Sequence, residues 1–233
     1  MTSDGKATRK GSGAARTTDP RRPAPVTSDS SPVADDRDPS KPTRARVLDA
    51  AMVSFGTTGF DATSLDQLAT ELGVRKQTIL YYFKSKPELL DAVIDETSRQ
   101  LADVLEAALV DAGDGFDRVE ALVRSVFRLA LRRPELLGVL REVARLGPPA
   151  ATRIADNLEP LVERARAFLE TEMDRGNFRQ GDARLLLLSV YTTVVGVATE
   201  VEVLRAVGIE PTLRTTAVRR RELLQFLHRA LVA

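Results

Sequence analysis

The sequence contains no cysteine and only one histidine, and these two absences remove several classes of protein. Without cysteine the chain can form no disulfide bond, no zinc finger and no thiol nucleophile. His228 lies near Arg229 late in a helical pattern, and neither a serine–histidine–aspartate set nor a metal-ligand cluster can be assembled around it. We therefore expect no enzyme, no metal site and no cofactor. The absence of cysteine also fits a reducing cytoplasm, where we expect the protein to reside.

Long apolar runs and a surplus of charge are also missing. The longest stretch without a charged residue, 185–199, has 15 residues, whereas a membrane-spanning helix needs about 20. The N-terminal segment is polar and lacks the apolar core of a secretory signal, so we expect no membrane contact. Because the net charge is only +1, any affinity for nucleic acid must come from a local basic patch.

Residues 1–41 differ in composition from the rest of the chain. They are rich in Gly, Ser, Thr, Pro, Asp and Arg and nearly free of large apolar residues, which predicts a disordered N-terminal tail. Its basic residues lie mostly in the first half and its acidic residues in the second. The tail is either a solvated extension or an arm that follows DNA phosphates, and we favour the first.

From residue 42 onward the chain has helical periodicity and no alternating strand pattern. Apolar residues recur three and four positions apart, and glycine or proline separates successive segments. Pro160 should kink or split the segment in which it lies. The pattern predicts an all-α fold of about nine helices, over residues 42–57, 65–72, 75–83, 86–112, 116–133, 134–146, 150–175, 182–207 and 211–232.

The segment 63–90 carries the most specific local signals. Ser64 followed by Gln67 matches a capping box at a helix start, and Gly73 can adopt the left-handed conformation that ends a helix. Ser85 followed by Glu88 matches a second capping box. These signals predict a short helix, a glycine turn, a second short helix and the start of a third, which is the arrangement of a DNA-binding helix-turn-helix.

The second short helix has a composition suited to reading bases. Ile79 and Phe83 can face the core with Val74, which leaves the polar side chains for other faces. Arginine and lysine pair with guanine, glutamine pairs with adenine, and tyrosine contacts phosphate. Residues 73–87 include four basic residues and no acidic one. DNA binding therefore explains the segment better than a merely solvated basic face does.

Residues 43–90 resemble the DNA-binding domain of the tetracycline-repressor (TetR) family of transcriptional regulators. The resemblance lies in residues 46–55, 59–64, 68–69, 73–74, 78–79, 82–86 and 89–90. The chain departs from the family at Arg75, where a small residue is usual, and at Gln77, where glycine, proline or alanine is common. It also has Leu80 where the family usually has a DNA-contacting tyrosine.

The resemblance implies two domains after the tail: a helix-turn-helix domain over 42–87 and a helical effector-binding and dimerisation domain over 88–233. We expect double-stranded DNA to be bound by the first domain. The expected contacts are Thr43, Ser64, Leu65, Arg75, Lys76, Gln77, Thr78, Tyr81, Tyr82, Lys84 and Lys86.

The helix expected over 182–207 is apolar around most of its circumference and must be covered on all sides. A four-helix bundle shared by two copies would cover it, although both of the last two helices could instead be ordinary core. The resemblance implies the homodimer, which would read a near-palindromic operator. The expected interface consists of Val194, Val197, Val201, Leu204, Leu213, Leu224, Leu227 and Leu231.

The resemblance also implies a small-molecule effector bound in the second domain. The candidate lining residues, each also explicable as ordinary core, are Phe127, Leu131, Phe168, Met173, Tyr191 and Thr192. Because few of them are polar, we expect an apolar effector. The function we predict is a ligand-responsive repressor. The alternative is a helical ligand carrier or protein-interaction module without operator specificity.

Overall fold

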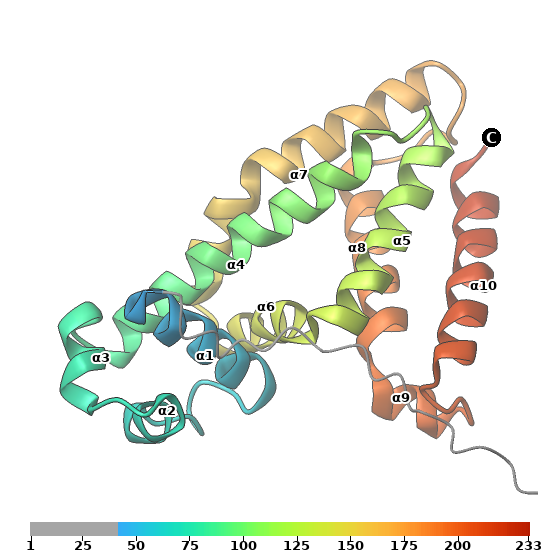
Figure 1. Ribbon diagram of the computed structural model, residues 1–233. Coiled ribbons are helices and arrows are strands. Elements are labelled where there is room, and N and C mark those ends of the chain that lie inside the picture. The colour runs from blue at the N-terminus through green and yellow to red at the C-terminus, as the bar shows by residue number, and fades with distance from the viewer. Residues whose placement is uncertain (1–41) are drawn as a thin grey trace, which may run out of the picture. The chain divides into compact units, whose positions relative to one another are not determined.

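The structure is a computed structural model that describes residues 42–233. These residues form ten α-helices and no β-strand, which confirms the all-α prediction (Figure 1). The expected disordered tail, residues 1–41, lies outside the described residues. The helices are α1 (Thr43–Thr57), α2 (Leu65–Leu72), α3 (Lys76–Tyr82), α4 (Lys86–Leu109), α5 (Phe116–Arg132), α6 (Pro134–Leu146), α7 (Ala150–Asp174), α8 (Ala183–Thr199), α9 (Val201–Ala206) and α10 (Leu213–Leu231).

Residues 42–233 contain neither a membrane-spanning helix nor a cluster of metal ligands. None of their helices combines the length and apolarity needed to cross a bilayer. Within the same residues, histidine and acidic side chains form no cluster that could hold a metal ion.

The prediction of a single helix over 182–207 is wrong. The chain leaves the helical conformation at Glu200, and a new helix, α9, begins at Val201. Glu200 has φ −81° and ψ 75°, and its side chain forms an ion pair with Arg141 of α6 at 3.4 Å. The preceding turns are rich in valine and threonine, whose branched side chains lower helix propensity. This break is the reason for ten helices rather than about nine.

Pro160 does not split its helix, contrary to one of the two expected outcomes. α7 is continuous across it, and ion pairs to α4 hold the helix on both sides of the proline. Arg153 contacts Asp95 at 2.6 Å before Pro160, and Arg164 pairs with Glu106 after it. These contacts and the packing of α7 along α4 compensate for the one backbone hydrogen bond that proline removes.

The described residues have two apolar cores. The first core is formed by side chains of α1, α2, α3, α4 and α6 and includes Phe55, Ile79 and Leu136. The second joins α5, α7, α8 and α10 and includes Phe127 and Leu227. Because α6 shares a core with the helix-turn-helix, the two halves of the chain meet through side-chain packing. The domain boundary expected at residue 87 stays a prediction.

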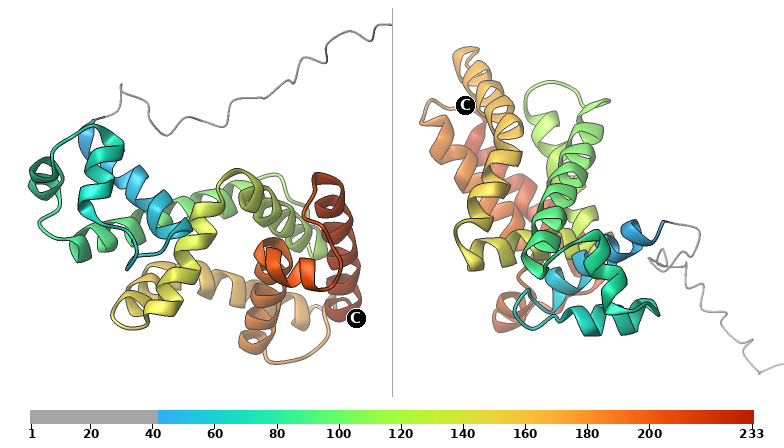
Figure 2. Two further views of the ribbon diagram at one scale, coloured as in Figure 1. Left: turned by 90° about the horizontal axis from the view of Figure 1, so that it is seen from below. Right: turned by 90° about the vertical axis from the view of Figure 1, so that its left-hand side faces the viewer.

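α1 and α6 cross in backbone contact at two glycines (Figures 1 and 2). A β-carbon built on Gly138 would lie 2.0 Å from the carbonyl oxygen of Gly56, and one built on Gly56 would lie 2.4 Å from the carbonyl oxygen of Glu135. Real β-carbons do not approach backbone so closely. Only glycine at both positions therefore permits this crossing.

Polar contacts at the end of α6 reinforce the crossing. Glu142 Oε1 accepts a hydrogen bond from the backbone N–H of Phe60 at 2.6 Å. Arg145 bridges Glu142 and Asp61, each at 2.8 Å. The hydrogen bonds from Arg145 and Phe60 lower the pKa of Glu142 below its usual value. The junction is therefore strongest when Glu142 is ionised, and it weakens as the pH falls through that lowered pKa.

We predict that Gly138→Ala destabilises the protein, because the added methyl group must displace the α1 backbone. Overpacking of this kind costs about 1–3 kcal/mol in the free energy of unfolding. Gly196→Ala is the matched control, since Gly196 is also helical and a β-carbon there meets nothing within 4 Å. That control should be neutral or stabilising by up to about 1 kcal/mol. Urea denaturation of both variants measures the difference, and equal stability would disprove the tight crossing.

Candidate nucleic-acid interface

The start and the end of α2 are set by local side-chain chemistry. The Ser64 hydroxyl accepts from the Gln67 backbone N–H at 3.1 Å, and the Gln67 side chain accepts from the Ser64 backbone N–H at 2.8 Å. This is the predicted capping box. Gly73 ends the helix at φ 66°, in the left-handed region that glycine adopts without strain. The turn thereby directs α3 away from α2.

α3 is anchored by two buried side chains and is exposed elsewhere. Ile79 and Phe83 are 0% and 2% exposed, as their spacing predicted. Leu80, which replaces the family's usual tyrosine, packs against the same core. Tyr81 is 81% exposed and contacts the ring of Tyr82 edge-on at 5.1 Å. The helix therefore offers one polar face to a partner while its other face holds it to α1 and α2.

Most of the expected DNA-binding residues are exposed or half-buried. Arg75, Gln77, Tyr81 and Lys84 are exposed. Thr43, Lys76, Thr78 and Tyr82 are half-buried. Arginine, glutamine and tyrosine side chains presented from a short helix can reach base edges and phosphates in a major groove.

Asp66 lowers the positive charge that the sequence of residues 73–87 predicted for this face. Residues 73–87 are free of acids, but the fold brings Asp66 of α2 to Lys76 of α3, with Oδ2 and Nζ 2.8 Å apart. Both side chains remain largely solvent-exposed, so the pair contributes little stability. Its consequence is electrostatic, because Lys76 is partly neutralised before any phosphate approaches.

Three expected contacts have structural roles that limit their availability. Leu65 is packed in the core, so only its backbone N–H could reach DNA. Ser64 is engaged in the helix cap. The ammonium group of Lys86 lies 4.2 Å from the centroid of the Phe60 ring, in a cation–π contact.

The second capping box, predicted for Ser85 and Glu88, forms only in part. Ser85 Oγ accepts from the Glu88 backbone N–H at 3.2 Å, but the Glu88 carboxylate accepts from Lys84 N–H rather than from Ser85. Glu88 thus places a negative charge beside the N-terminus of α4. This carboxylate reduces the attraction of Lys84 and Lys86 for phosphate.

Sequence reasoning missed Arg44, which lies in the first turn of α1 close to α3. Its guanidinium carbon is 5.0 Å from the centroid of the Phe83 ring, and the residue is exposed. The basic residues Arg44 and Arg46 near the start of the first helix were the available signal. Arg46, in contrast, donates to the Leu72 carbonyl at 3.2 Å and supports the end of α2.

The expected interface and effector residues differ in how far their own chain buries them. Of the interface set, Val194, Leu204, Leu227 and Leu231 are buried within their own chain, Val197 and Leu224 are half-buried, and Val201 and Leu213 are exposed. Of the effector set, Phe127 and Met173 are buried, Phe168 is half-buried, and Leu131, Tyr191 and Thr192 are exposed. Both residue sets therefore stay predictions.

Comparison with known proteins agrees with the geometry of the helix-turn-helix. Residues 47–93 match the model of the bacterial regulatory proteins of the tetR family. The chain is 34% identical over 107 residues to the HTH-type transcriptional repressor DrrR1 of Streptomyces coeruleorubidus. That alignment covers 45% of this chain and 38% of the relative, so the chain spans well under half of the length of DrrR1.

Solved structures match over a longer part of the chain. A regulator from Saccharomonospora viridis in complex with choline matches with a TM-score of 0.69 and 22% identity, over 82% of this chain and 97% of that one. AibR, in complex with isovaleryl coenzyme A and operator DNA, matches with a TM-score of 0.60 and 18% identity, over 66% and 85%. At these identities the matches show the fold. Together with the family match, they show that residues 47–93 have the sequence of the DNA-binding domain of the tetR family of bacterial regulatory proteins and that the chain has the fold of solved regulators.

Proposed function

We propose that the protein is a homodimeric repressor that binds a near-palindromic operator through α3 and is released by a small effector. The observation that carries the proposal is the exposed face of α3. Arg75, Gln77 and Tyr81 extend from a helix whose opposite side is held in the core by Ile79 and Phe83. A helix anchored on one side and polar on the other can enter a major groove without unfolding.

DNA contacts divide into those that read bases and those that hold phosphates. Arg75 and Gln77 lie at the N-terminal end of α3, the part of a recognition helix that meets base edges. Lys84 and Arg44 lie beyond the ends of α3 and are suited to flanking phosphates. Since the net charge of the whole chain is only +1, these few residues supply the attraction to DNA.

Unpaired apolar side chains on α8 and α10 support the homodimer. Leu185, Leu188 and Tyr191 of α8 are 49–63% exposed, and Phe226 of α10 is 59% exposed. α8 and α10 also pack against each other. Exposed apolar groups on adjacent helices mark interaction surfaces. The proposed interface thus uses the helices expected from sequence but mostly other residues of them.

The α1–α6 crossing is the route by which an effector would act on DNA binding. α6 follows α5 after the single residue Arg133, contacts α1 through Gly138, and contacts the turn after α1 through Glu142. A displacement of α6 must therefore move α1 and the recognition helix attached to it. An effector shifts DNA binding only if it binds the two arrangements with different affinity. AibR, solved with both a ligand and operator DNA, shares this fold.

Selection of genomic fragments by the purified protein tests the whole proposal. The expected result is enrichment of fragments with two related half-sites about 34–36 Å apart, or one helical turn. If no duplex were enriched at low ionic strength, the operator-binding function would be disproved. The alternative of a ligand carrier or protein-interaction module would then be favoured.

We predict that Gln77→Ala and Lys84→Ala reduce DNA binding in two different ways. Because Gln77→Ala loses a bidentate base contact, it should weaken the free energy of operator binding by about 1–3 kcal/mol and relax the sequence preference at one position. Lys84→Ala should weaken binding to operator and random DNA alike and lower the salt slope by about one. Fluorescence anisotropy at several salt concentrations measures both effects. Equal loss on random DNA for Gln77→Ala would show that this residue does not read bases.

We predict that Asp66→Asn strengthens non-specific DNA binding, because it removes the charge that neutralises Lys76. The slope of log affinity against log salt should become steeper by about one. Asp156→Asn is the matched control, since it changes the net charge equally at an exposed position on α7. If both variants shifted the slope by the same amount, the local pair would have no specific role.

We predict that Phe226→Arg shifts the protein toward monomer, with dimerisation at least about tenfold weaker, because an interface anchor is lost and a charge is introduced. Val110→Arg, at a 78% exposed position on the end of α4, is the control. Analytical ultracentrifugation over a concentration series distinguishes them. Leu227→Arg is unsuitable, since Leu227 is 2% exposed within its own chain and the variant should unfold. A Phe226→Arg protein that remained dimeric would exclude this face.

A further inference from the structure

Three cations around α3 have no carboxylate partner among residues 42–233. Arg75 directly precedes α3, Lys84 follows it, and Arg44 lies in the first turn of α1. All three side chains are exposed, and none forms an ion pair with the described residues. The Arg44 guanidinium carbon lies 5.0 Å from the ring centroid of Phe83, the residue beside Lys84. Cations from α1 and α3 therefore lie close together near the end of α3.

A carboxylate of the chain itself already occupies part of this surface. Arg44, Arg75, Lys76 and Lys84 are called the cationic face below, and Lys76 is the member that is paired, with Asp66 at 2.8 Å. Carboxylate and phosphate oxygens bind the same N–H donors of lysine and arginine. The Asp66 pair therefore shows that this surface accepts a carboxylate from its own chain, and three cations remain for others.

Three further carboxylates lie in the sequence just before the first described residue, Pro42. Asp35, Asp36 and Asp38 fall within four positions, interrupted only by Arg37. Asp38 is four positions before Pro42 and Asp35 is seven. Because an extended chain spans at most about 3.3–3.6 Å per residue, Asp38 lies within about 14 Å of Pro42 and Asp35 within about 25 Å.

This length of chain matches the extent of the cationic face. Pro42 is the residue before α1, so Arg44 and the neighbouring Lys84 are within reach of Asp38. α3 has seven residues and is therefore about 10 Å long. The three additional positions between Asp38 and Asp35 span about the same length. The acidic run can thus follow α3 from Lys84 toward Arg75.

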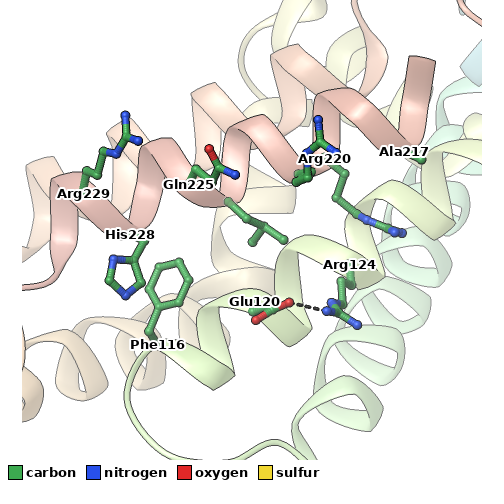
Figure 3. A pocket seen from close by; sticks show the side chains of 10 residues that line it. Phe116, Glu120, Arg124, Ala217, Arg220, Gln225, His228 and Arg229 are labelled. Atoms are coloured by element: carbon green, nitrogen blue, oxygen red, sulfur yellow. Dashed lines mark hydrogen bonds and ion pairs between the residues drawn. The ribbon is translucent and has the colours of Figure 1, made fainter. Parts of the chain in front are cut away.

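The arginines of α10 offer no comparable match. They line an open groove of about 550 Å³ between α5 and α10, but Arg220 and Arg229 lie nine positions apart at its separate ends (Figure 3). Arg124 of α5 is already paired with Glu120 there. α10 also lies at the opposite end of the described residues from α3 (Figures 1 and 2). The cationic face is therefore the better site for an acidic run that ends beside α1.

We infer that Asp35, Asp36 and Asp38 bind the cationic face of their own chain and compete there with DNA. Tethering gives these carboxylates a local concentration of about millimolar, so pairs that are individually weak at an exposed surface suffice for partial occupancy. DNA then binds only those molecules whose cationic face is free, and its apparent affinity falls by that fraction. The competition with DNA rests on the proposed function, whereas the binding of the carboxylates does not.

The absence of cysteine permits a direct test in the full-length chain. Ala34→Cys, beside the acidic run, is combined with Tyr81→Cys, at an 81% exposed position of α3. The rate of disulfide formation within one chain, followed by non-reducing electrophoresis, measures how often the two positions meet. The triple variant, with Asn at positions 35, 36 and 38, should slow this rate at least about threefold, since it removes three exposed ion pairs. An unchanged rate would overturn the inference.

Ala34→Cys combined with Gln225→Cys is the matched control, because Gln225 is exposed and lines the groove beside α10. Its disulfide should form more slowly, at a rate that the triple variant leaves unchanged. Salt at about 1 M, where the screening length is about 3 Å, should slow the Tyr81→Cys pair to the rate of the triple variant. A Gln225→Cys pair that formed faster and depended on the aspartates would locate the acidic run on α10 and overturn the assignment.

Competition with DNA is measured separately, on the cysteine-free chain, by fluorescence anisotropy. The triple variant should bind operator and random DNA about threefold to tenfold more tightly at low salt, and the gain should disappear as salt is raised. A control variant with Asp156→Asn, Glu159→Gln and Asp174→Asn changes the net charge equally on α7. Its three positions are exposed and form no ion pair within residues 42–233.

The two measurements separate the parts of the inference. If the disulfide rate depended on the aspartates but the triple variant bound DNA no better than the control variant, the competition would be overturned and the binding to the cationic face would stand. If no duplex bound to any variant, the proposed function would fail. The disulfide rates would still decide whether the acidic run binds the cationic face.

Discussion

The backbone contact between Gly56 and Gly138 is the constraint on which the rest of the structure depends. It brings α1 and α6 closer than any pair of side chains would permit, and so lets the two helices share one core. The position of α3 is set against α1, and the position of α6 is set against α5, α7 and α8. The exposed polar face of α3 and the C-terminal helices are therefore joined by a close helix crossing rather than by a linker.

The sequence predicted those parts of the fold that depend on neighbouring residues. The cap at Ser64, the left-handed turn at Gly73 and the buried pair Ile79 and Phe83 are all encoded within one or two helical turns. These local signals sufficed for the helix-turn-helix and for its family. Most other helix ends were also found within a few residues, because glycine and proline interrupt the periodicity.

What the sequence could not predict depends on residues that are distant along the chain. Asp66 meets Lys76 only because α2 and α3 fold against each other, and Arg141 reaches Glu200 across 59 positions. Apolar composition predicted α8 and α10 as interface helices, but it could not tell which of their leucines their own chain buries. Leu227 and Leu231 face the core, whereas Phe226 faces solvent.

The ion pair between Asp66 and Lys76 has a consequence for the way the protein searches for its operator. A regulator must leave incorrect sequences quickly, and its dwell time on them is set by charge alone, because only phosphates are held there. With Lys76 already paired, fewer cations contribute to this indiscriminate attraction. The protein should therefore dissociate sooner from irrelevant stretches of chromosome, while the exposed polar groups of α3 remain available for prolonged residence at the correct one.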